Sequence, residues 1–322
     1  MITRRILLAS GIAAPLASLH PAALAEPRPI RLIVPFGAGG VADLTARAVA
    51  QKMGENMGQS IVIENKPGAG GVVAAETVAR AEPDGNTLLL MSNAMAVSMA
   101  LFKTLSFDAR RDFAPVSLLG LFDLAVVVPE NSRFKTLAEL LAWGQENAGR
   151  LNIGTIAVGS TQHLAAEWFN AQSNLHAQIV PFNGTPAVIN ALRGGQVDAA
   201  IEILGPVKPQ LAAKAMRALA VLGESRPADL PGVVAARELP GLSSINISSW
   251  NALAAPARTP AATLERLNRE VARALQAPEV RKRLTDLSVQ PRASSPEQLA
   301  RLLDSDIRRW TDVIQRAGIA RQ

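Results

Sequence analysis

From Pro29 onward, short runs rich in β-branched and other aliphatic residues alternate with longer amphipathic segments. Residues 30–36, 61–64 and 88–91 have the length and composition of strands, and residues 41–57 and 72–81 have the apolar spacing of helices. Strands that alternate with helices are typical of α/β proteins, so the pattern predicts an α/β fold.

The same alternation starts again in the middle of the chain. Further strands are predicted at residues 124–128, 151–156, 178–181, 199–203 and 217–221. Helices are predicted at residues 137–147, 162–170, 186–192 and 207–213 and, in three Arg-rich amphipathic segments, at 261–276, 278–287 and 296–317. The chain therefore contains a complete second α/β unit inside the first.

An interrupted α/β unit is typical of a two-lobed hinge protein, in which the lobes close over a ligand. We assign residues 26–127 and 223–322 to a discontinuous first lobe and residues 128–222 to an inserted second lobe. The chain crosses between the lobes twice, and we expect hinge strands near residues 126–128 and 219–222.

The first 25 residues form a unit of their own. Arg4 and Arg5 precede an apolar run over residues 6–19, and the small residues of Ala23-Leu24-Ala25 fit a signal-peptidase site. The run has no polar face, which argues against an amphipathic helix. The paired arginines also fit a twin-arginine signal, so two export routes stay open. We predict a periplasmic protein whose leader is removed.

Composition removes several classes of site. The chain has no Cys and only three His, so disulfides, thiolate zinc sites and iron–sulfur clusters are excluded and a histidine-rich metal site is disfavoured. Its 33 basic residues are scattered among 27 acidic ones, and the low aromatic content, without any Tyr, leaves few stacking platforms for nucleic acid. We expect no metal, no cofactor and no nucleic-acid partner.

The pentapeptide Gly-Ala-Gly-Gly-Val occurs at residues 37–41 and again at 68–72, each time directly before a predicted helix. Glycines at a helix start let bare N–H groups approach an anion, which the partial positive charge of the helix end favours. A dinucleotide fingerprint with Glu64 as its acid is a weaker interpretation, because Pro35 interrupts the strand end and the glycine spacing is imperfect. For the second copy we expect a simple tight turn.

Five polar residues lie where predicted strands end or helices begin. Asp43 is placed to cap the first helix rather than to contact a ligand. Ser160 and Thr161 either cap a helix or donate hydroxyls to a bound carboxylate. His163 suggests a hydrolase with Ser160, but both residues lie in one helical turn and no nucleophile elbow surrounds the serine. Glu202 ends a strand, where it either accepts a hydrogen bond from a ligand or is a solvated terminus.

Several longer motifs occur in order along nearly the whole chain after residue 28. They are Pro29 to Asp43, Val62 to Gly71, Pro83 to Gly85, Asp112 to Val116, Gly159-Ser160 with His163-Leu164, Pro181 to Gly184, Gly194 to Asp198, Ser249-Trp250, and Ala255 to Ala257 with Thr259-Pro260. Together they resemble the Bug receptors, the extracytoplasmic solute-binding proteins of tripartite tricarboxylate transporters.

The resemblance implies a two-lobed periplasmic-binding-protein fold of type II that closes on a small carboxylic acid. It implies that the loop after the first strand and the helix start of the second lobe hold the ligand's carboxylates, and that two further loops line the pocket. With Glu202 added from the strand analysis, the candidate ligand-binding residues are Phe36, Gly39, Gly40, Ser92, Asn93, Ser160, Thr161, Asn183, Gly184 and Glu202.

This sequence departs from the family at two loops. The family usually has Pro-Pro-Gly-Gly where this chain has Gly-Ala-Gly-Gly at residues 37–40, and it often has Tyr-Lys-Gly where this chain has Phe-Asn-Gly at residues 182–184. The second departure removes a positive charge and a hydroxyl, which leaves the charge of the distal ligand group open.

We predict a binding protein, not an enzyme: a monomeric receptor that delivers a small organic acid to the membrane permease subunits of a tripartite tricarboxylate transporter. A sensor that presents its ligand to a membrane signalling protein is the second possibility. A secreted α/β enzyme is the third, but the sequence offers no nucleophile elbow, metal cluster or good dinucleotide loop for it. Composition and motifs do not name the acid.

Overall fold

A computed structural model describes residues 28–156, 158, 160–227, 229–316 and 318–322. The predicted signal segment and Gly159 lie outside the described residues. In chain order the elements are β1 (Ile30–Val34), α1 (Val41–Met57), β2 (Ile61–Asn65), η1 (Ala69–Gly71), α2 (Val72–Ala79), β3 (Thr87–Ser92), α3 (Asn93–Leu101), β4 (Phe113–Pro129), α4 (Leu137–Glu146), β5 (Asn152–Ile156), α5 (Thr161–Ser173), β6 (Gln178–Phe182), α6 (Thr185–Arg193), β7 (Ala199–Ile203), α7 (Leu204–Ala212), β8 (Met216–Val221), β9 (Val234–Ala235), η2 (Ala236–Glu238), β10 (Ser248–Pro256), α8 (Ala261–Gln276), α9 (Pro278–Asp286), β11 (Gln290–Pro291) and α10 (Pro296–Arg316).

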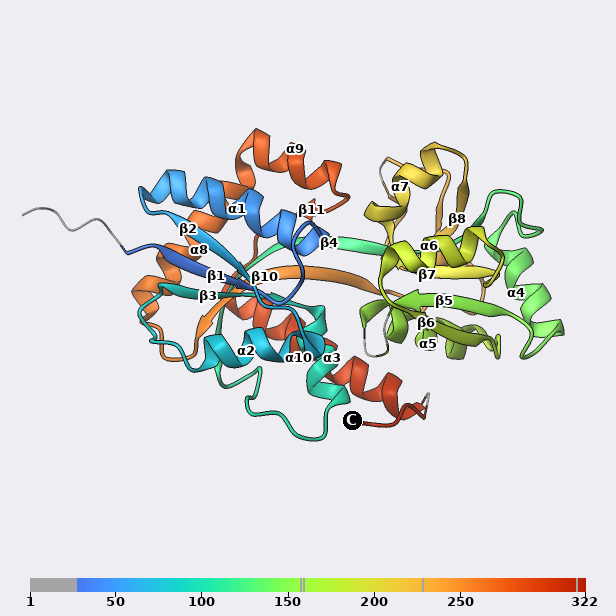
Figure 1. Ribbon diagram of the computed structural model, residues 1–322, viewed down its shortest axis with the longest axis horizontal. Coiled ribbons are helices and arrows are strands. Elements are labelled where there is room, and N and C mark those ends of the chain that lie inside the picture. The colour runs from blue at the N-terminus through green and yellow to red at the C-terminus, as the bar shows by residue number, and fades with distance from the viewer. Residues whose placement is uncertain (1–27, 157, 159, 228, 317) are drawn as a thin grey trace, which may run out of the picture.

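The first lobe is built on a sheet with the strand order β2-β1-β3-β10-β4. β1 pairs in parallel with β2 and β3, and β10 runs antiparallel between β3 and β4. Ile30, Leu32 and Val34 pack toward α1, α8 and α9, whereas Ile33 packs toward α2, α3 and α10 (Figure 1). Because both faces of β1 are covered, its residues are apolar except Arg31, which is exposed and pairs with Glu64 of β2.

The second lobe is built on the far end of β4. β4 pairs there with β7 and β8, and β5 lies between β7 and β6. Ala125, Val127 and Ala200 pack toward α6 and α7, while Val126 and Ile201 belong to the core that includes α4 and α5. Each sheet therefore has helices on both faces, and the predicted α/β class is confirmed.

Two long strands run side by side between the lobes (Figure 1). β4 passes from the first sheet into the second, and β10 pairs with it from Ser248, opposite Asp123, to Pro256. Ser248 donates a hydrogen bond to the Asp123 carboxylate at 3.0 Å, and a Cβ at Gly223 would lie 2.1 Å from the same carboxylate oxygen. This packed cluster marks the hinge.

The predicted limits of the second lobe need adjustment. β9 pairs with β8 beyond residue 222, and Leu230 and Val233 pack in the core of the second lobe. Ile247 then donates its N–H to the Leu222 carbonyl just before β10 begins. The start of β10, rather than residues 219–222, makes the return crossing. We therefore propose that the inserted lobe extends from about residue 124 to about residue 247, instead of from 128 to 222.

Two elements that cross or border the hinge were not predicted. α3 follows β3 with no breaker between them, so the run from Leu88 to Leu101 offered no boundary. β10 consists largely of Ser and Ala, which have low strand propensity, and its strand conformation depends on its two neighbours β3 and β4. Pairing with β10 extends β4 well upstream of its predicted start at residue 124.

Candidate functional site

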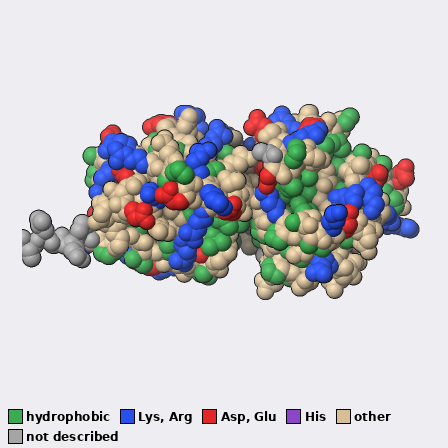
Figure 2. Space-filling model, turned by 90° about the horizontal axis from the view of Figure 1, so that it is seen from above, with side chains coloured by type: hydrophobic (Ala, Val, Ile, Leu, Met, Phe, Trp, Pro, Cys, Tyr) green, Lys and Arg blue, Asp and Glu red, His purple; other side chains and the backbone are tan. Residues whose placement is uncertain are grey.

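The carboxyl ends of strands from both lobes converge at the hinge. β3 ends at Ser92, opposite Asn251 near the start of β10, and β1 and β2 run parallel to β3. From the other lobe, Glu202 near the end of β7 lies opposite Ala125 of β4, with β5 and β6 parallel to it. The surface is indented between the lobes (Figure 2). In α/β folds, ligands bind outside the carboxyl ends of strands, so this junction is the candidate site.

Five helices begin at this junction. α1 and α3 start there from the first lobe, and α5, α6 and α7 start there from the second, each within a few residues of a converging strand end. Free backbone N–H groups and the helix dipole make a helix start favourable for an anion. The arrangement can therefore hold negatively charged groups from two sides.

The loop between β1 and α1 is exposed from residue 37 to residue 40, with Phe36 half-buried. Gly39 has φ +85°, a conformation that favours glycine, and a Cβ built on it would meet no atom within 4 Å. Gly40 is the N-cap residue of α1, and no side chain among the described residues caps that helix start. The sequence prediction that Gly39 and Gly40 present open backbone at a helix start agrees with this geometry.

Asp43 holds this loop in place. Its buried carboxylate accepts hydrogen bonds from the Gly39 N–H at 2.8 Å, from Arg47 Nε at 2.9 Å and from Asn65 Nδ2 at 2.8 Å. The Asn65 amide also donates to the Phe36 carbonyl at 2.9 Å. Burial raises the pKa of Asp43, but these hydrogen bonds outweigh it and keep the pKa below its usual value. Asp43 therefore positions the loop, and Asn65 is a supporting residue that the sequence analysis missed.

Ser92 and Asn93 lie where β3 passes into α3, and both are buried. The Asn93 Oδ1 atom accepts a hydrogen bond from Trp310 Nε1 at 2.7 Å, so this oxygen is committed to α10. Its Nδ2 atom has no partner among the described residues. Asn93 thus anchors the C-terminal helix, and only its amide nitrogen remains for a ligand or a water.

Asn251 is a candidate that the sequence analysis did not find. It is fully buried, lies directly opposite Ser92, and neither atom of its amide forms a hydrogen bond within the described chain. Opposed residues of an antiparallel pair point to the same face, so Asn251 and Ser92 are neighbours. Buried amides are normally satisfied by a protein group, an ordered water or a ligand. The sequence pattern did not indicate Asn251 as a site residue, because β10 itself was not predicted as a strand.

In the second lobe, Ser160 caps α5. Its hydroxyl accepts the His163 backbone N–H at 3.1 Å, and Thr161 beside it is 8% exposed. The His163 ring lies near Glu167, with 3.8 Å between Nε2 and Oε1, and burial lowers the pKa of His163. Ser160 thus interacts with the backbone of His163 and not with its ring, which removes the basis for a serine–histidine pair.

The turn before α6 is open to solvent. Asn183 is exposed, and Gly184 is half-buried with φ +90° as the N-cap residue. Thr185, the first residue of the helix, points inward and donates its hydroxyl to Glu202 Oε2 at 2.9 Å. Asn183 and Gly184 therefore lie at the junction, and their contact with a ligand stays a prediction. Thr185 is a further residue that the sequence analysis missed.

Glu202 is fully buried, so the interpretation of it as a solvated strand terminus is wrong. Its Oε2 atom accepts from Thr185, from the Ile203 N–H at 3.3 Å and from Gln162 Nε2 at 3.5 Å. Its Oε1 atom has no partner among the described residues. Burial raises the pKa of Glu202 to about 7, although the three hydrogen bonds act in the opposite direction.

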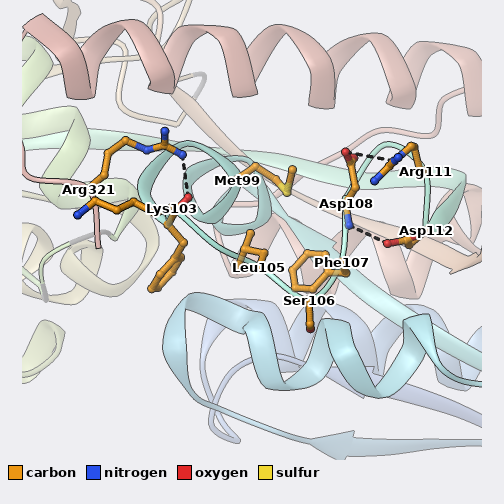
Figure 3. Close-up of a pocket in the computed structure, with 10 residues that line it drawn as sticks. Met99, Lys103, Leu105, Ser106, Phe107, Asp108, Arg111, Asp112 and Arg321 are labelled. Atoms are coloured by element: carbon orange, nitrogen blue, oxygen red, sulfur yellow. Dashed lines mark hydrogen bonds and ion pairs between the residues drawn. The ribbon is translucent and has the colours of Figure 1, made fainter.

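A separate cavity of about 330 Å³ opens on the first lobe, between α3, the loop that follows it and the C-terminal residues (Figure 3). Arg321 donates to the Phe102 carbonyl at 2.8 Å. The Lys103 N–H donates to the Gln322 carbonyl, and the Gln322 N–H donates to the Leu101 carbonyl. None of the five converging helix starts lines it. We therefore place the candidate site at the junction of the lobes and not in this cavity.

Comparison with known proteins agrees with this arrangement. Residues 45–319 match the family described as "Tripartite tricarboxylate transporter family receptor". The chain belongs to this family. The protein BugT of Bordetella pertussis is 33% identical over 313 residues, which cover 96% of this chain and 94% of BugT. The resemblance to Bug receptors is thereby confirmed.

Two solved structures from Rhodopseudomonas palustris are similar over most of the chain. MatC, solved with bound malate, is 34% identical with a TM-score of 0.78 and covers 89% of this chain and 99% of its own. A second protein, solved with adipate, is 31% identical with a TM-score of 0.81 and covers 91% of this chain and 98% of its own. Solved relatives also include periplasmic binding proteins, which confirms the predicted two-lobed fold.

Within the described part of the chain, no helix combines the length and the apolar character that crossing a membrane requires. Family members are periplasmic receptors for small ligands.

Proposed function

We propose that this protein is a periplasmic receptor that captures a small carboxylic acid between its two lobes and delivers it to the membrane permease of a tripartite tricarboxylate transporter. The observation that carries the proposal is the convergence of five helix starts, from both lobes, on one junction. The malate and adipate bound by two relatives support a carboxylate as the ligand. In this role the protein binds its ligand and does not transform it.

The candidate contacts divide between the lobes. We propose that the backbone of Gly39 and Gly40, with Ser92, holds one carboxylate from the first lobe. Thr161 and the turn at Gly184 hold the ligand from the second lobe, at the starts of α5 and α6. β4 and β10 act as the hinge, so ligand binding brings the lobes together.

A thermal-shift screen against mono-, di- and tricarboxylates tests the capture step. An acid present at one hundred times its dissociation constant stabilises the folded protein by about 2.7 kcal/mol. We expect malate, adipate or another member of the panel to produce a shift of this size, and small-angle scattering to show a smaller radius of gyration with that acid. Absence of a shift with every acid, together with turnover of an ester or phosphate, would favour an enzyme instead.

We also propose that residues 1–25 are a secretory signal and that a membrane permease receives the acid. Mass spectrometry of the exported protein should find an N-terminus close to residue 26. A strain that lacks the protein should lose high-affinity uptake of the captured acid, and uptake should return with the full-length gene. Uptake that is unchanged in the deletion strain would argue for a sensory role.

A further inference from the structure

Glu202 has an asymmetric environment that the capture of a carboxylate does not by itself explain. Three donors, the Thr185 hydroxyl, the Gln162 amide and the Ile203 N–H, all point at Oε2. Oε1 is buried and has no partner among the described residues. A carboxylate has two equivalent oxygens that both need donors, whereas a carboxylic acid has one oxygen that accepts and one hydroxyl that donates.

The observed pattern fits the acid form. Oε2 accepts all three hydrogen bonds, as the carbonyl oxygen of a neutral acid does. Oε1 corresponds to the hydroxyl of that acid, and no acceptor for it lies among the described residues. A fully buried carboxylate without a cation is costly, and Glu202 forms no ion pair within the described residues. Burial raises the pKa of this group to about 7, in agreement with the geometry.

The charged groups on the surrounding elements have other partners. On α5, His163 and Glu167 interact with each other, and on α7, Lys208 pairs with Asp229. On β4, Asp123 accepts from Ser248, and just before β7, Asp198 accepts from the Asn152 N–H and lies 3.6 Å from Arg133. On α6, the titratable residue is Arg193 in the last turn, at the opposite end of the helix from Thr185. The local field at Glu202 therefore comes from neutral donors and helix starts.

Those helix starts matter for the ligand. Gln162 lies in the first turn of α5, Thr185 begins α6, and α7 begins two residues after Glu202. The positive ends of these helices can offset one negative charge at the junction. If Glu202 were ionised, its own negative charge would offset the positive potential of the helix ends and repel an incoming carboxylate. With Glu202 neutral, that positive potential stabilises the carboxylate of the ligand.

We propose that Glu202 binds the ligand as a neutral carboxylic acid, whose hydroxyl at Oε1 donates a hydrogen bond to a carboxylate of the ligand, so that capture takes up a proton from solution. This inference rests on the proposed function and specifies the ligand's group at this position: an ionised carboxylate, not an ammonium or a hydroxyl donor. It makes the receptor bind more tightly as the pH falls.

The direction follows from linkage. The complex holds one proton more than the ionised free protein, so affinity is greatest below the pKa of free Glu202 and falls as the pH rises through it. Above pH 7.5 the dissociation constant should rise by about tenfold per pH unit. Malate and adipate are suitable probes, because ordinary carboxyl groups titrate near pH 4, well below this range.

Calorimetric titration with malate and adipate between pH 6.5 and 8.5, in two buffers that differ in ionisation enthalpy, measures the proton directly. We expect uptake of about half a proton at pH 7, rising toward one at pH 8. In Glu202→Gln, whose amide nitrogen can donate where the hydroxyl does, uptake should disappear and binding at pH 8.5 should be about 30-fold tighter than in the wild type. Glu167→Gln removes another carboxyl of the same lobe and should keep the wild-type pH slope.

Proton release on binding, with affinity that rises with pH and weaker binding by Glu202→Gln, would overturn the proposal and show that an ionised Glu202 accepts from the ligand. A pH-independent affinity with no proton transfer would overturn it as well. If neither malate nor adipate binds, the carboxyl ¹³C resonances of the ligand-free protein decide the protonation claim separately from the proposed function. A glutamate carboxyl that titrates near pH 7 and is missing in Glu202→Gln supports it, and none that titrates above pH 6 contradicts it. If Glu202→Gln does not fold, a glutamate carboxyl that titrates near pH 7 in the wild type and is retained in Glu167→Gln supports the claim instead.

Discussion

The two copies of Gly-Ala-Gly-Gly-Val lie in the same lobe, each before a helix, yet they differ in the space available for a side chain at their glycines. In the first copy, residues 37–40 are exposed, and a Cβ on Gly39 would meet nothing within 4 Å. In the second copy, a Cβ on Gly70 would lie 2.7 Å from Ser98 Oγ, and one on Gly71 would lie 3.2 Å from Pro35 Cβ. The backbone of the first copy is therefore open toward the junction, whereas the glycines of the second copy allow close packing against neighbouring side chains.

The difference comes from what covers each loop, because the pentapeptide is the same. α3 lies against the second copy, and Ser98 donates a hydrogen bond to the Gly70 carbonyl at 3.0 Å. In the first copy, the buried Asp43 carboxylate accepts a hydrogen bond from the Gly39 N–H, and the other side of the loop is exposed. Glycine therefore permits close backbone approach in both places: toward a helix in the second copy and, as we propose, toward a ligand in the first. Substitutions in the two copies should separate affinity from stability.

The largest effect is expected for Gly40→Val. Gly40 has φ −78° and ψ 168°, an extended conformation open to any residue, and a Cβ there would come no closer than 3.9 Å to the Gly37 carbonyl oxygen. The branched side chain would cover the start of α1 and should weaken acid binding by about 100-fold, or about 2.7 kcal/mol. Loss of the N-cap glycine should cost about 1 kcal/mol of folding stability at most. Calorimetry and urea unfolding measure the two quantities.

Unchanged affinity in folded Gly40→Val would remove the first loop from the ligand site. Gly39→Val is a poorer test, because φ +85° at that position would also strain the backbone and mix the two effects.

Gly70→Ala should give the reverse result. Alanine at φ +64° costs about 1 kcal/mol, and its methyl group would displace the Ser98 hydroxyl from the Gly70 carbonyl, for a total loss of about 2 kcal/mol in the free energy of unfolding. Acid affinity should stay within threefold of the wild type. Adding Ser98→Ala to this variant should restore part of the stability, since the contact is then relieved. A large loss of affinity without a loss of stability would mean that the second copy also faces the ligand.

Asp43→Asn should weaken the support of the first loop. The substitution removes the charge that accepts from Gly39, Arg47 and Asn65, which should cost about 2 kcal/mol at pH 7 and a few fold in affinity. The pKa of Asp43 is lowered in the folded protein, so its contribution is present above the ordinary aspartate pKa of 3.8 and is lost as the pH falls through the lower folded value. The stability gap between wild type and variant should therefore narrow below pH 4. A gap that is constant with pH would contradict the ionised network.

The comparison also shows what local sequence can and cannot predict. α1 and α8 begin and end at the predicted residues, because their apolar periodicity and flanking glycine or proline are local signals. The open backbone at Gly39 was likewise predictable from a glycine loop between a strand and a helix. The close packing around Gly70 could not be predicted, because it depends on α3, a helix that no breaker residue separates from β3.

The second half of the site was harder to predict for the same reason. The burial of Glu202 is produced by Gln162 and Thr185, which are 40 and 17 residues away in the chain and reach it only after α5 and α6 pack on the sheet. Asn251 depends on the pairing of β10 with β3, whose residues are separated by about half of the chain. Local pattern located the strand ends and helix starts, and tertiary packing decided which polar groups are buried between them.

The smallest effect tests the second lobe, with a matched pair of helix caps. Ser160 accepts from the His163 N–H at 3.1 Å at the start of α5, and Thr136 accepts from the Glu139 N–H at 3.2 Å at the start of α4, away from the junction. Ser160→Ala and Thr136→Ala should each cost about 1 kcal/mol of stability, since each removes one cap. Ser160→Ala alone should also weaken acid binding, by about threefold to tenfold, because a frayed first turn moves Thr161 and the Gln162 amide that contacts Glu202. Parallel urea unfolding and calorimetry of the two variants isolate this difference. If Ser160→Ala binds the acid as tightly as Thr136→Ala does, the start of α5 does not hold the ligand, and the contacts of the second lobe must be sought at α6 and α7.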